Sequence, residues 1–216
     1  MLKRLYDLFF ATLGLLTLGV PLLIVALAVK LGDGGPVFFL QDRVGQGGRR
    51  FKIRKFRTMV VNAEKLGLSI TSGGDRRITR VGKFLRRTKL DELPQLWNVL
   101  RGDMSFVGPR PEVPRYVDIY TPAQRAVLDL KPGITDLATL EFRNEEELLR
   151  QAPDPERFYI DYCIGRKIEL NLAYARHAGI LDDTVIILRT LLPGLRWRTR
   201  AELVPPSAPG PTPPHA

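Results

Sequence analysis

The chain has 216 residues, of which 33 are Lys or Arg and 23 are Asp or Glu, so its formal net charge is +10. Its 44% apolar content suffices for the core of one domain of ordinary size and excludes disorder throughout. The single cysteine, Cys163, excludes an intramolecular disulfide and a cysteine-rich zinc site. Because the only histidines are His177 and His215, any bound metal should be a hard ion held by oxygen.

The N-terminal segment is long and apolar, with no charged residue from Leu8 to Val29. A helix of about 20 residues crosses the hydrocarbon core of a bilayer, so this segment predicts a membrane helix. A cleaved signal peptide is the weaker interpretation, because the apolar region of a signal peptide is usually shorter. The two other interpretations, a straight span and a bent helix, both anchor the protein in a membrane.

The flanking charges and one proline bear on this choice. Lys3 and Arg4 precede the apolar run and Lys30 follows it. Because positive residues mark the cytoplasmic side of a membrane helix, a straight span would place one of these basic flanks on the wrong side. Pro21 lies in the middle of the run, where it removes a backbone hydrogen bond and bends a helix. A helix bent at Pro21 would enter one leaflet and return, which leaves both flanks in the cytoplasm. Since spanning helices also tolerate proline, the residues alone leave both topologies open.

The positive charge is concentrated just after this segment. Between Arg43 and Lys89 there are 15 basic and two acidic residues, a surplus of 13, so the rest of the chain is slightly acidic. Such a field suits a phosphate-rich partner, which is a nucleic acid, an anionic lipid head group or a nucleotide diphosphate. The ordinary alternative is a basic surface that is merely solvated.

The remainder predicts an α+β fold that is mostly helical. Val37–Val44 and Arg50–Arg57 are predicted to pair as a small β-hairpin around residues 46–48. Helices are predicted at 60–66, 79–87, 91–101, 122–131, 145–151, 155–176 with a break at Gly165, and 183–192. Loops are predicted at 68–77 and, because of its Pro and Gly content, at 105–111. These elements divide the chain into a membrane helix (1–31), one compact domain (32–203) and a disordered Pro-rich tail (204–216).

The best candidate for chemistry is the pair Asp91 and Glu92 at the start of a predicted helix. The helix dipole favours anions there and lowers carboxyl pKa values, which suits a nucleophile or a Mg²⁺ ligand. Acids in a first helical turn are also ordinary helix stabilisers. The neighbouring cations Arg86, Arg87 and Lys89 favour a site in which a carboxylate attacks phosphorus while cations hold the phosphate oxygens.

Three further arginines are candidate phosphate ligands. Arg57 ends the second predicted strand, and Arg110 lies on a stiff backbone between Pro109 and Pro111. Arg143 follows a short apolar stretch and could face the same site. Each has an ordinary alternative. Arg57 could simply solvate the end of a strand, Arg110 could lie in an exposed turn, and Arg143 could pair with Glu141 or Glu145.

At this point the sequence carries a resemblance to a known family. The run from Arg86 to Pro111, which contains Lys89-Leu90-Asp91-Glu92-Leu93-Pro94, resembles the signature of the bacterial sugar transferases, which are monotopic phosphoglycosyl transferases. Further matches, in the same order along the chain, are Lys55-Phe56-Arg57-Thr58-Met59, Thr79 with Gly82, and Lys131-Pro132-Gly133-Ile134-Thr135. The resemblance covers roughly residues 1–200. Three positions depart from the pattern: Val20 before Pro21, where relatives commonly have Ser; Arg76, where Pro often precedes the matching Arg77; and Asp136, where a small residue is usual.

The resemblance implies a reaction at the start of glycoconjugate assembly. Such enzymes transfer a sugar 1-phosphate from a UDP-sugar donor to undecaprenyl phosphate and release UMP. It implies that Asp91 is the nucleophile, which forms a covalent phosphosugar–enzyme ester that the polyprenyl phosphate then attacks. Mg²⁺ is the implied cofactor, with Asp91 and Glu92 as its ligands and Glu92 as an assisting ligand or base.

The resemblance also implies the substrate-binding residues and the location. The implied substrate-binding residues are Lys55, Arg57, Arg77, Thr79, Arg86, Arg87, Pro109, Arg110, Pro111 and Arg143. Of these, 109–111 resembles the nucleotide-binding turn of the family and Arg143 its phosphate contact. The implied fold is a re-entrant helix, bent at Pro21, packed on a catalytic domain at the cytoplasmic face of the inner membrane. Its partners would be the donor, the acceptor and inner-membrane lipid, with no nucleic acid.

A rival hypothesis from another class is a non-catalytic membrane tether that binds anionic lipid or nucleic acid through residues 43–89. It predicts strongly salt-dependent binding and no special role for Asp91 or Glu92. The sequence leaves open which sugar is carried, which pathway is served, the oligomeric state and the role of the Pro-rich tail.

Overall fold

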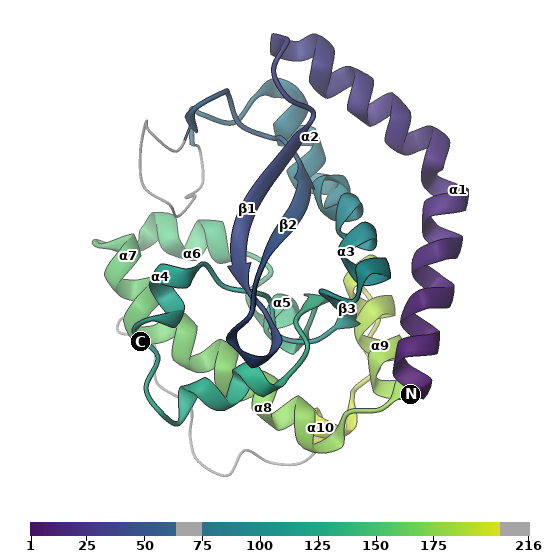
Figure 1. Ribbon diagram of the computed structural model, residues 1–216. Coiled ribbons are helices and arrows are strands. Elements are labelled where there is room, and N and C mark those ends of the chain that lie inside the picture. Colours follow the sequence, from purple (N-terminus) through teal and green to yellow (C-terminus); the bar gives the residue numbers. More distant parts are fainter. Residues whose placement is uncertain (64–74, 204–216) are drawn as a thin grey trace.

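The computed structural model describes residues 1–63 and 75–203. The long helix α1 (Leu2–Asp33) lies along one side of the molecule, and the hairpin of β1 (Phe38–Val44) and β2 (Arg50–Phe56) lies near its middle (Figure 1). The helical elements that surround the hairpin are α2 (Arg80–Thr88), η3 (Leu90–Gln95), α3 (Leu96–Arg101), α4 (Pro114–Val117), η4 (Gln124–Asp129), α5 (Leu137–Glu141), α6 (Glu145–Gln151), α7 (Pro155–Phe158), η5 (Tyr159–Cys163), α8 (Ile164–His177), α9 (Ile180–Leu191) and α10 (Arg200–Leu203). The described residues are therefore mostly helical with small sheets, as predicted.

Helix α1 is a single helix of 32 residues that contains Pro21. It is bent, so that both of its ends return to the rest of the chain (Figure 1). Gly34 ends it in the left-handed conformation, with φ of 71° and its N–H bonded to the carbonyl of Lys30. By length and composition it could cross a membrane. Its exposed face is apolar and includes Leu5, Phe9, Leu13, Leu16, Val20, Leu23 and Leu27.

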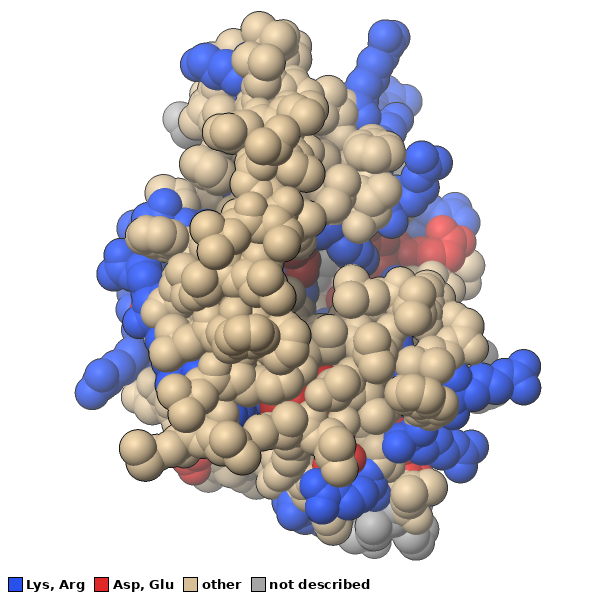
Figure 2. Space-filling model, turned by 90° about the vertical axis from the view of Figure 1, so that its right-hand side faces the viewer, with Lys and Arg blue, Asp and Glu red and all other residues tan. Residues whose placement is uncertain are grey.

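The surface along α1 is uncharged, and Lys and Arg side chains gather at its edges (Figure 2). The opposite face of the helix packs on the domain, where Ala11 is fully buried and contributes to a cluster with Ile53, Leu96 and Met104. Nearer the C-terminal end, Val29 packs with Phe56 and Leu85. The helix is thus part of the core along its inner face and apolar on its outer face.

The predicted hairpin is confirmed. Its strands pair in antiparallel register from Phe38 opposite Phe56 to Val44 opposite Arg50, and the short 3₁₀ helix η1 (Gln46–Gly48) connects them. Alternation along β2 buries Ile53 and exposes Lys52. The hairpin brings the carboxyl end of β2 against η3.

The predicted helix at 79–87 is confirmed as α2, which Thr79 caps by accepting a hydrogen bond from the N–H of Gly82 at 2.9 Å. The continuous helix predicted at 91–101 is wrong. The chain instead forms the 3₁₀ helix η3 and then α3, because Pro94 has no N–H to donate in the ladder of an α-helix. Gly102 ends α3 as predicted, with φ of 88°.

The segment predicted as a loop at 105–111 contains a strand. β3 (Ser105–Val107) pairs in parallel with β4 (Gly133–Thr135), and strands of three residues are too short to show an alternating pattern. The helix predicted at 122–131 is the shorter 3₁₀ helix η4, and the break in the helix at 155–176 is the π-helical turn η5, before Gly165. α6 is confirmed, and α9 begins three residues before the predicted start. The predictions for 60–66, 68–77 and 204–216 lie partly or wholly outside the described residues.

Candidate active site

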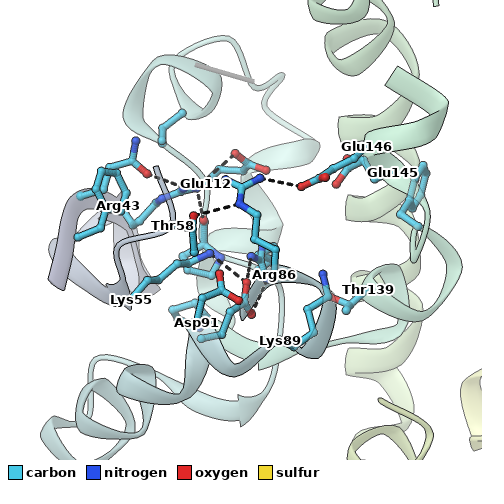
Figure 3. Close-up of a pocket in the computed structure, with 18 of the residues that line it drawn as sticks. Arg43, Lys55, Thr58, Arg86, Lys89, Asp91, Glu112, Thr139, Glu145 and Glu146 are labelled. Atoms are coloured by element: carbon cyan, nitrogen blue, oxygen red, sulfur yellow. Dashed lines mark hydrogen bonds and ion pairs between the residues drawn. The ribbon is translucent and has the colours of Figure 1, made fainter. Parts of the chain in front are cut away.

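A cavity of about 1730 Å³ lies between the end of the hairpin, α2, η3, the turn at 109–111 and helices α5, α6 and α8 (Figure 3). The predicted site residues that line it are Lys55, Arg57, Arg77, Arg86, Arg87, Asp91, Glu92, Pro109, Arg110, Pro111 and Arg143. Thr79 instead lines a smaller cavity of about 290 Å³ at the end of α1, together with Arg57. The fold therefore gathers residues from five separate stretches of the sequence around one space.

Asp91 lies on η3 at the wall of this cavity and is 7% exposed. Its Oδ1 atom is buried and has no hydrogen-bond partner among the described residues. Burial and the adjacent Glu92 raise the pKa of this carboxyl, and the cations Lys55 and Arg86 only oppose that shift. The expected lowering by a helix dipole is wrong for Asp91, because a buried position on a short 3₁₀ helix has little dipole to offset desolvation.

Glu92 is held between two cations. Lys55 donates to its Oε1 at 3.0 Å, and Arg110 binds both carboxylate oxygens, with 3.3 Å between Nη1 and Oε2. Burial raises the pKa of Glu92, but Arg110 and Lys55 outweigh it and hold that pKa well below its usual range. Burial lowers the pKa of Lys55 to about 8, and Glu92 opposes this. Glu92 is thus a largely buried anion, with 13% of its side chain exposed, that joins the end of β2 to the turn at 109–111.

Arg86 reaches across the cavity from α2 to α6. Its Nε donates to Thr58 Oγ1 at 3.0 Å and its Nη1 to Glu146 Oε1 at 2.9 Å (Figure 3). Lys89, in the left-handed conformation with φ of 59°, joins α2 to η3 close to Asp91. These cations surround Asp91 in an arrangement suited to phosphate oxygens.

The turn that carries Arg110 is fixed from several sides. The N–H of Arg110 donates to Asp136 Oδ2 at 3.1 Å, and Arg43 Nη1 donates to the carbonyl of Pro111 at 3.0 Å. Asp136 also accepts from the N–H of Thr139 at 2.6 Å and from Asn171 Nδ2 at 2.8 Å. The unusual residue at position 136 therefore connects the turn to α5 and α8.

Several predicted substrate ligands are engaged with the protein itself. Arg57 forms a two-pronged ion pair with Asp33 and donates to the carbonyls of Pro36 and Met59. Arg77 pairs with Asp75 in the same way and donates to the carbonyl of Ala63. Thr79 caps α2, and the exposed Arg143 donates to the carbonyl of Arg189 at 2.8 Å. Direct substrate contact by these four residues stays a prediction.

A second polar cluster on the cavity wall was not predicted from the sequence. Tyr159 donates to Glu112, and Lys167 pairs with Glu145 and lies 4.6 Å from the centre of the Tyr159 ring. Glu112 directly follows Pro111, and this proximity to a predicted site residue is the only feature of the sequence that could have indicated the cluster. The other members come from helices far along the chain, where no motif or spacing marks them.

The residues fit a Mg²⁺ ion that is held mainly by substrate. The described residues contain no group of three or more His, Cys, Asp or Glu side chains arranged to hold a metal. Mg²⁺ is usually bound by one or two carboxylates together with substrate phosphates and water. The unpartnered oxygen of Asp91 suits this role, whereas both oxygens of Glu92 already accept hydrogen bonds from Lys55 or Arg110.

Comparison with known proteins identifies the class. The family model described as bacterial sugar transferase matches residues 1–196, so the chain belongs to the bacterial sugar transferase family. The match includes α1, both strands of the hairpin and the whole of the candidate site.

Three relatives show the range of proteins that the chain is similar to. It is 37% identical to a UDP-N-acetylgalactosamine-undecaprenyl-phosphate N-acetylgalactosaminephosphotransferase of Aeromonas hydrophila, over 88% of this chain and 43% of that protein. It is 38% identical to the UDP-glucose:undecaprenyl-phosphate glucose-1-phosphate transferase of Escherichia coli K12, over 90% of this chain and 40% of that protein. It is 33% identical to the exopolysaccharide production protein ExoY of Sinorhizobium fredii, over 88% of this chain and 83% of that protein. The chain thus spans about two fifths of the first two relatives and most of the third.

Proposed function

We propose that this protein transfers a sugar 1-phosphate from a UDP-sugar to undecaprenyl phosphate, as the first membrane step of glycoconjugate assembly. Family membership and the names of the relatives support this reaction class. The observation that carries it is the buried carboxylate oxygen of Asp91, which has no partner within residues 1–63 and 75–203, in a large cavity walled by Lys55, Arg86 and Arg110.

The proposed chemistry has two displacements at the same phosphorus atom. In the first, a carboxylate oxygen of Asp91 attacks the phosphorus that bears the sugar. The bond from that phosphorus to the bridging oxygen breaks, and its electron pair leaves with UMP. In the second, a phosphate oxygen of undecaprenyl phosphate attacks the phosphorus of the aspartyl ester. This regenerates the Asp91 carboxylate and yields the diphosphate-linked sugar.

The surrounding residues supply charge and position. Lys55, Arg86 and Arg110 offer hydrogen bonds to phosphate oxygens, whose negative charge they neutralise. Glu92 keeps Lys55 and Arg110 at a fixed separation through its two ion pairs. Asp91 would hold Mg²⁺ together with substrate oxygens, and the ion when bound would neutralise phosphate charge and favour the ionised form of the carboxylate. Glu92 stays paired with Lys55 and Arg110.

The contacts of α1 support a re-entrant helix and a cytoplasmic catalytic domain. At its N-terminal end Lys3 pairs with Asp183, and at its C-terminal end Asp33 pairs with Arg57. Both partners belong to the same folded body, which can lie on only one side of a bilayer. The basic residues at both ends favour the cytoplasmic side.

The nucleophile is tested by Asp91→Asn, with Asp118→Asn as the matched control because Asp118 is an exposed aspartate that does not line the cavity. UMP release is measured with a panel of UDP-sugars, Mg²⁺ and undecaprenyl phosphate in detergent or nanodiscs. Asp91→Asn should lower turnover at least about a thousand-fold, because loss of a nucleophile removes the covalent route. The control should match the wild type, and chelation of Mg²⁺ should stop release reversibly.

Intact-protein mass spectrometry provides the direct observation. With donor but no acceptor, the wild type and Asp118→Asn should gain the mass of one sugar phosphate, and Asp91→Asn should gain none. Substantial turnover by Asp91→Asn, or an adduct on another residue, would contradict the proposal. A protein that binds anionic lipid or nucleic acid but releases no UMP with any donor would favour the non-catalytic tether.

A further inference from the structure

The apolar helix α1 carries one carboxylate on its inner face. Asp7 is 2% exposed, and its Oδ1 accepts hydrogen bonds from Ser105 Oγ and from the N–H of Phe106, both at 3.1 Å. A buried carboxylate costs several kcal/mol unless donors satisfy it, so the helix packs here only with these two bonds made. Asp7 has no part in the chemistry proposed above.

These bonds complete the open edge of a two-stranded sheet. Ser105 and Val107 pair with β4, so the N–H of Phe106, which lies between them, points away from β4 and toward α1. In a larger sheet a third strand would accept this bond. Here the Asp7 carboxylate replaces that strand, and the bond is charge-assisted and correspondingly strong.

The segment that connects β3 to Arg110 is short, and its backbone is tightly packed. A Cβ on Gly108 would lie 2.1 Å from the carbonyl oxygen of Lys131, so the backbone just after β3 packs directly on the backbone just before β4. The N–H of Gly133 donates to the carbonyl of Pro109 at 3.0 Å. Arg110, the next residue, binds Glu92. A shift of β3 at Phe106 therefore moves the cation that holds Glu92.

The N-terminal end of α1 also contacts the segment that carries Asp91 and Glu92. Arg4 donates to the carbonyls of Val99 and Leu100 at 2.6 and 2.8 Å, which satisfies the C-terminal end of α3. Helix α3 continues directly from η3, which carries Asp91 and Glu92. The N-terminal half of α1 runs beside both α3 and β3 (Figure 1). The N-terminal end of α1 therefore contacts both segments that build the site, η3–α3 and β3 with the turn at 109–111.

We propose that Asp7 is a positioning residue, which sets the geometry of Arg110 and Glu92 by holding the free edge of β3 to the membrane helix. This assignment rests on the proposed function for its catalytic consequence, but the mechanical link rests on the contacts alone. The position that α1 takes in the membrane then also determines the positions of Arg110 and Glu92.

The test compares Asp7→Asn, which keeps an acceptor oxygen, with Asp7→Leu, which removes it at similar size. Leu5→Ala is the matched control, because Leu5 is 63% exposed on the same helix. A second variant, Ser105→Ala, removes one of the two donors and leaves α1 unchanged. Hydrogen exchange of the wild type and all variants is followed by mass spectrometry in nanodiscs without substrate, and UMP release is measured in parallel.

In Asp7→Leu, the non-proline amides of residues 105–110 should exchange about 10- to 100-fold faster, the effect expected from loss of the charge-assisted bond to the N–H of Phe106. Exchange in α8 should stay at the wild-type rate. The kcat/KM for donor should fall by a similar factor in Asp7→Leu and less in Ser105→Ala. Asp7→Asn should recover most of the activity, and Leu5→Ala should match the wild type.

Unchanged exchange at 105–110 in both Asp7→Leu and Ser105→Ala would overturn the mechanical link. Faster exchange in every helix would also overturn it, because it would show a general loss of stability rather than positioning. Faster local exchange with wild-type kcat/KM would overturn the catalytic consequence. A wild type that releases no UMP from any donor would instead refute the proposed function, while the exchange measurement would still decide the link.

Discussion

At the scale of single residues, the pair of Arg57 and Asp33 holds the C-terminal end of α1 to the domain. Arg57 is 7% exposed, and its guanidinium binds both oxygens of Asp33. Asp33→Asn leaves Arg57 with the carbonyls of Pro36 and Met59, and because Asp33 is exposed the change should lower the free energy of unfolding by about 1 to 2 kcal/mol. The exposed pair of Asp42 and Lys52 is the matched control, since Asp42→Asn should cost less than about 1 kcal/mol.

Thermal unfolding in detergent measures this difference, and donor KM separates the two roles of Arg57. If the role is structural, Asp33→Asn lowers Tm while the KM of the folded protein stays near the wild-type value. A lower KM at unchanged Tm would instead support the substrate contact predicted for Arg57, because its guanidinium would be less neutralised.

The sequence placed individual residues well where a local motif marks them. The Lys89–Pro94 run located Asp91 and Glu92, and Lys55 and Arg110 were found through their own short motifs. The partners of these residues were harder to predict. Nothing local indicates that Arg57 is bound by Asp33, or that Asp136 joins Arg110 to Asn171, because these contacts depend on how distant elements pack.

At the scale of elements, the contact between α2 and α6 crosses the mouth of the candidate site. Glu146 on α6 accepts from Arg86 at 2.9 Å, and under the proposed function it would compete there with a phosphate of the donor. Glu146 is half exposed, so the pair should contribute less than about 1 kcal/mol. Glu146→Gln should therefore lower the KM for donor by about two- to five-fold, because Arg86 keeps its place near the cavity with less of its charge neutralised.

Initial rates across donor concentrations measure this effect, with Glu141→Gln as control. Glu141 is a partly exposed glutamate on α5 that pairs with Arg166 and does not line the cavity. A KM that rises in Glu146→Gln would show that Glu146 assists donor binding rather than competing with it.

Elements with a strong periodic pattern were predicted nearly to the residue, as α2, α6 and the hairpin show. The errors fall where tertiary packing or one residue overrides the pattern. Pro94 converts the first turn of a predicted helix to η3, and the π-helical turn η5 has no sequence signal. The parallel pair β3–β4 was not predicted, because strands of three residues show no alternation. This pair nevertheless connects Asp7 to Arg110.

At the scale of the whole molecule, the two ends of α1 constrain its path through a membrane. A straight helix of 32 residues would be about 48 Å long, more than the roughly 30 Å hydrocarbon core. A straight span would therefore separate the Lys3 contact with Asp183 from the Asp33 contact with Arg57 by the full bilayer. Both contacts are to the same folded body, and the bend of α1 between them (Figure 1) favours the proposed re-entrant path over a straight span.

Single-cysteine labelling in oriented membrane vesicles tests this topology. The native Cys163 is fully buried, so it provides a silent background for cysteines placed at Leu2, Val20 and Asp42. Leu2→Cys and Asp42→Cys should both react with a membrane-impermeant maleimide in inside-out vesicles and in neither case in right-side-out vesicles. Val20→Cys lies on the exposed apolar face and should react only after detergent is added. Labelling of Leu2→Cys and Asp42→Cys from opposite faces would establish a spanning helix, and would require the contacts of one end of α1 to break on insertion.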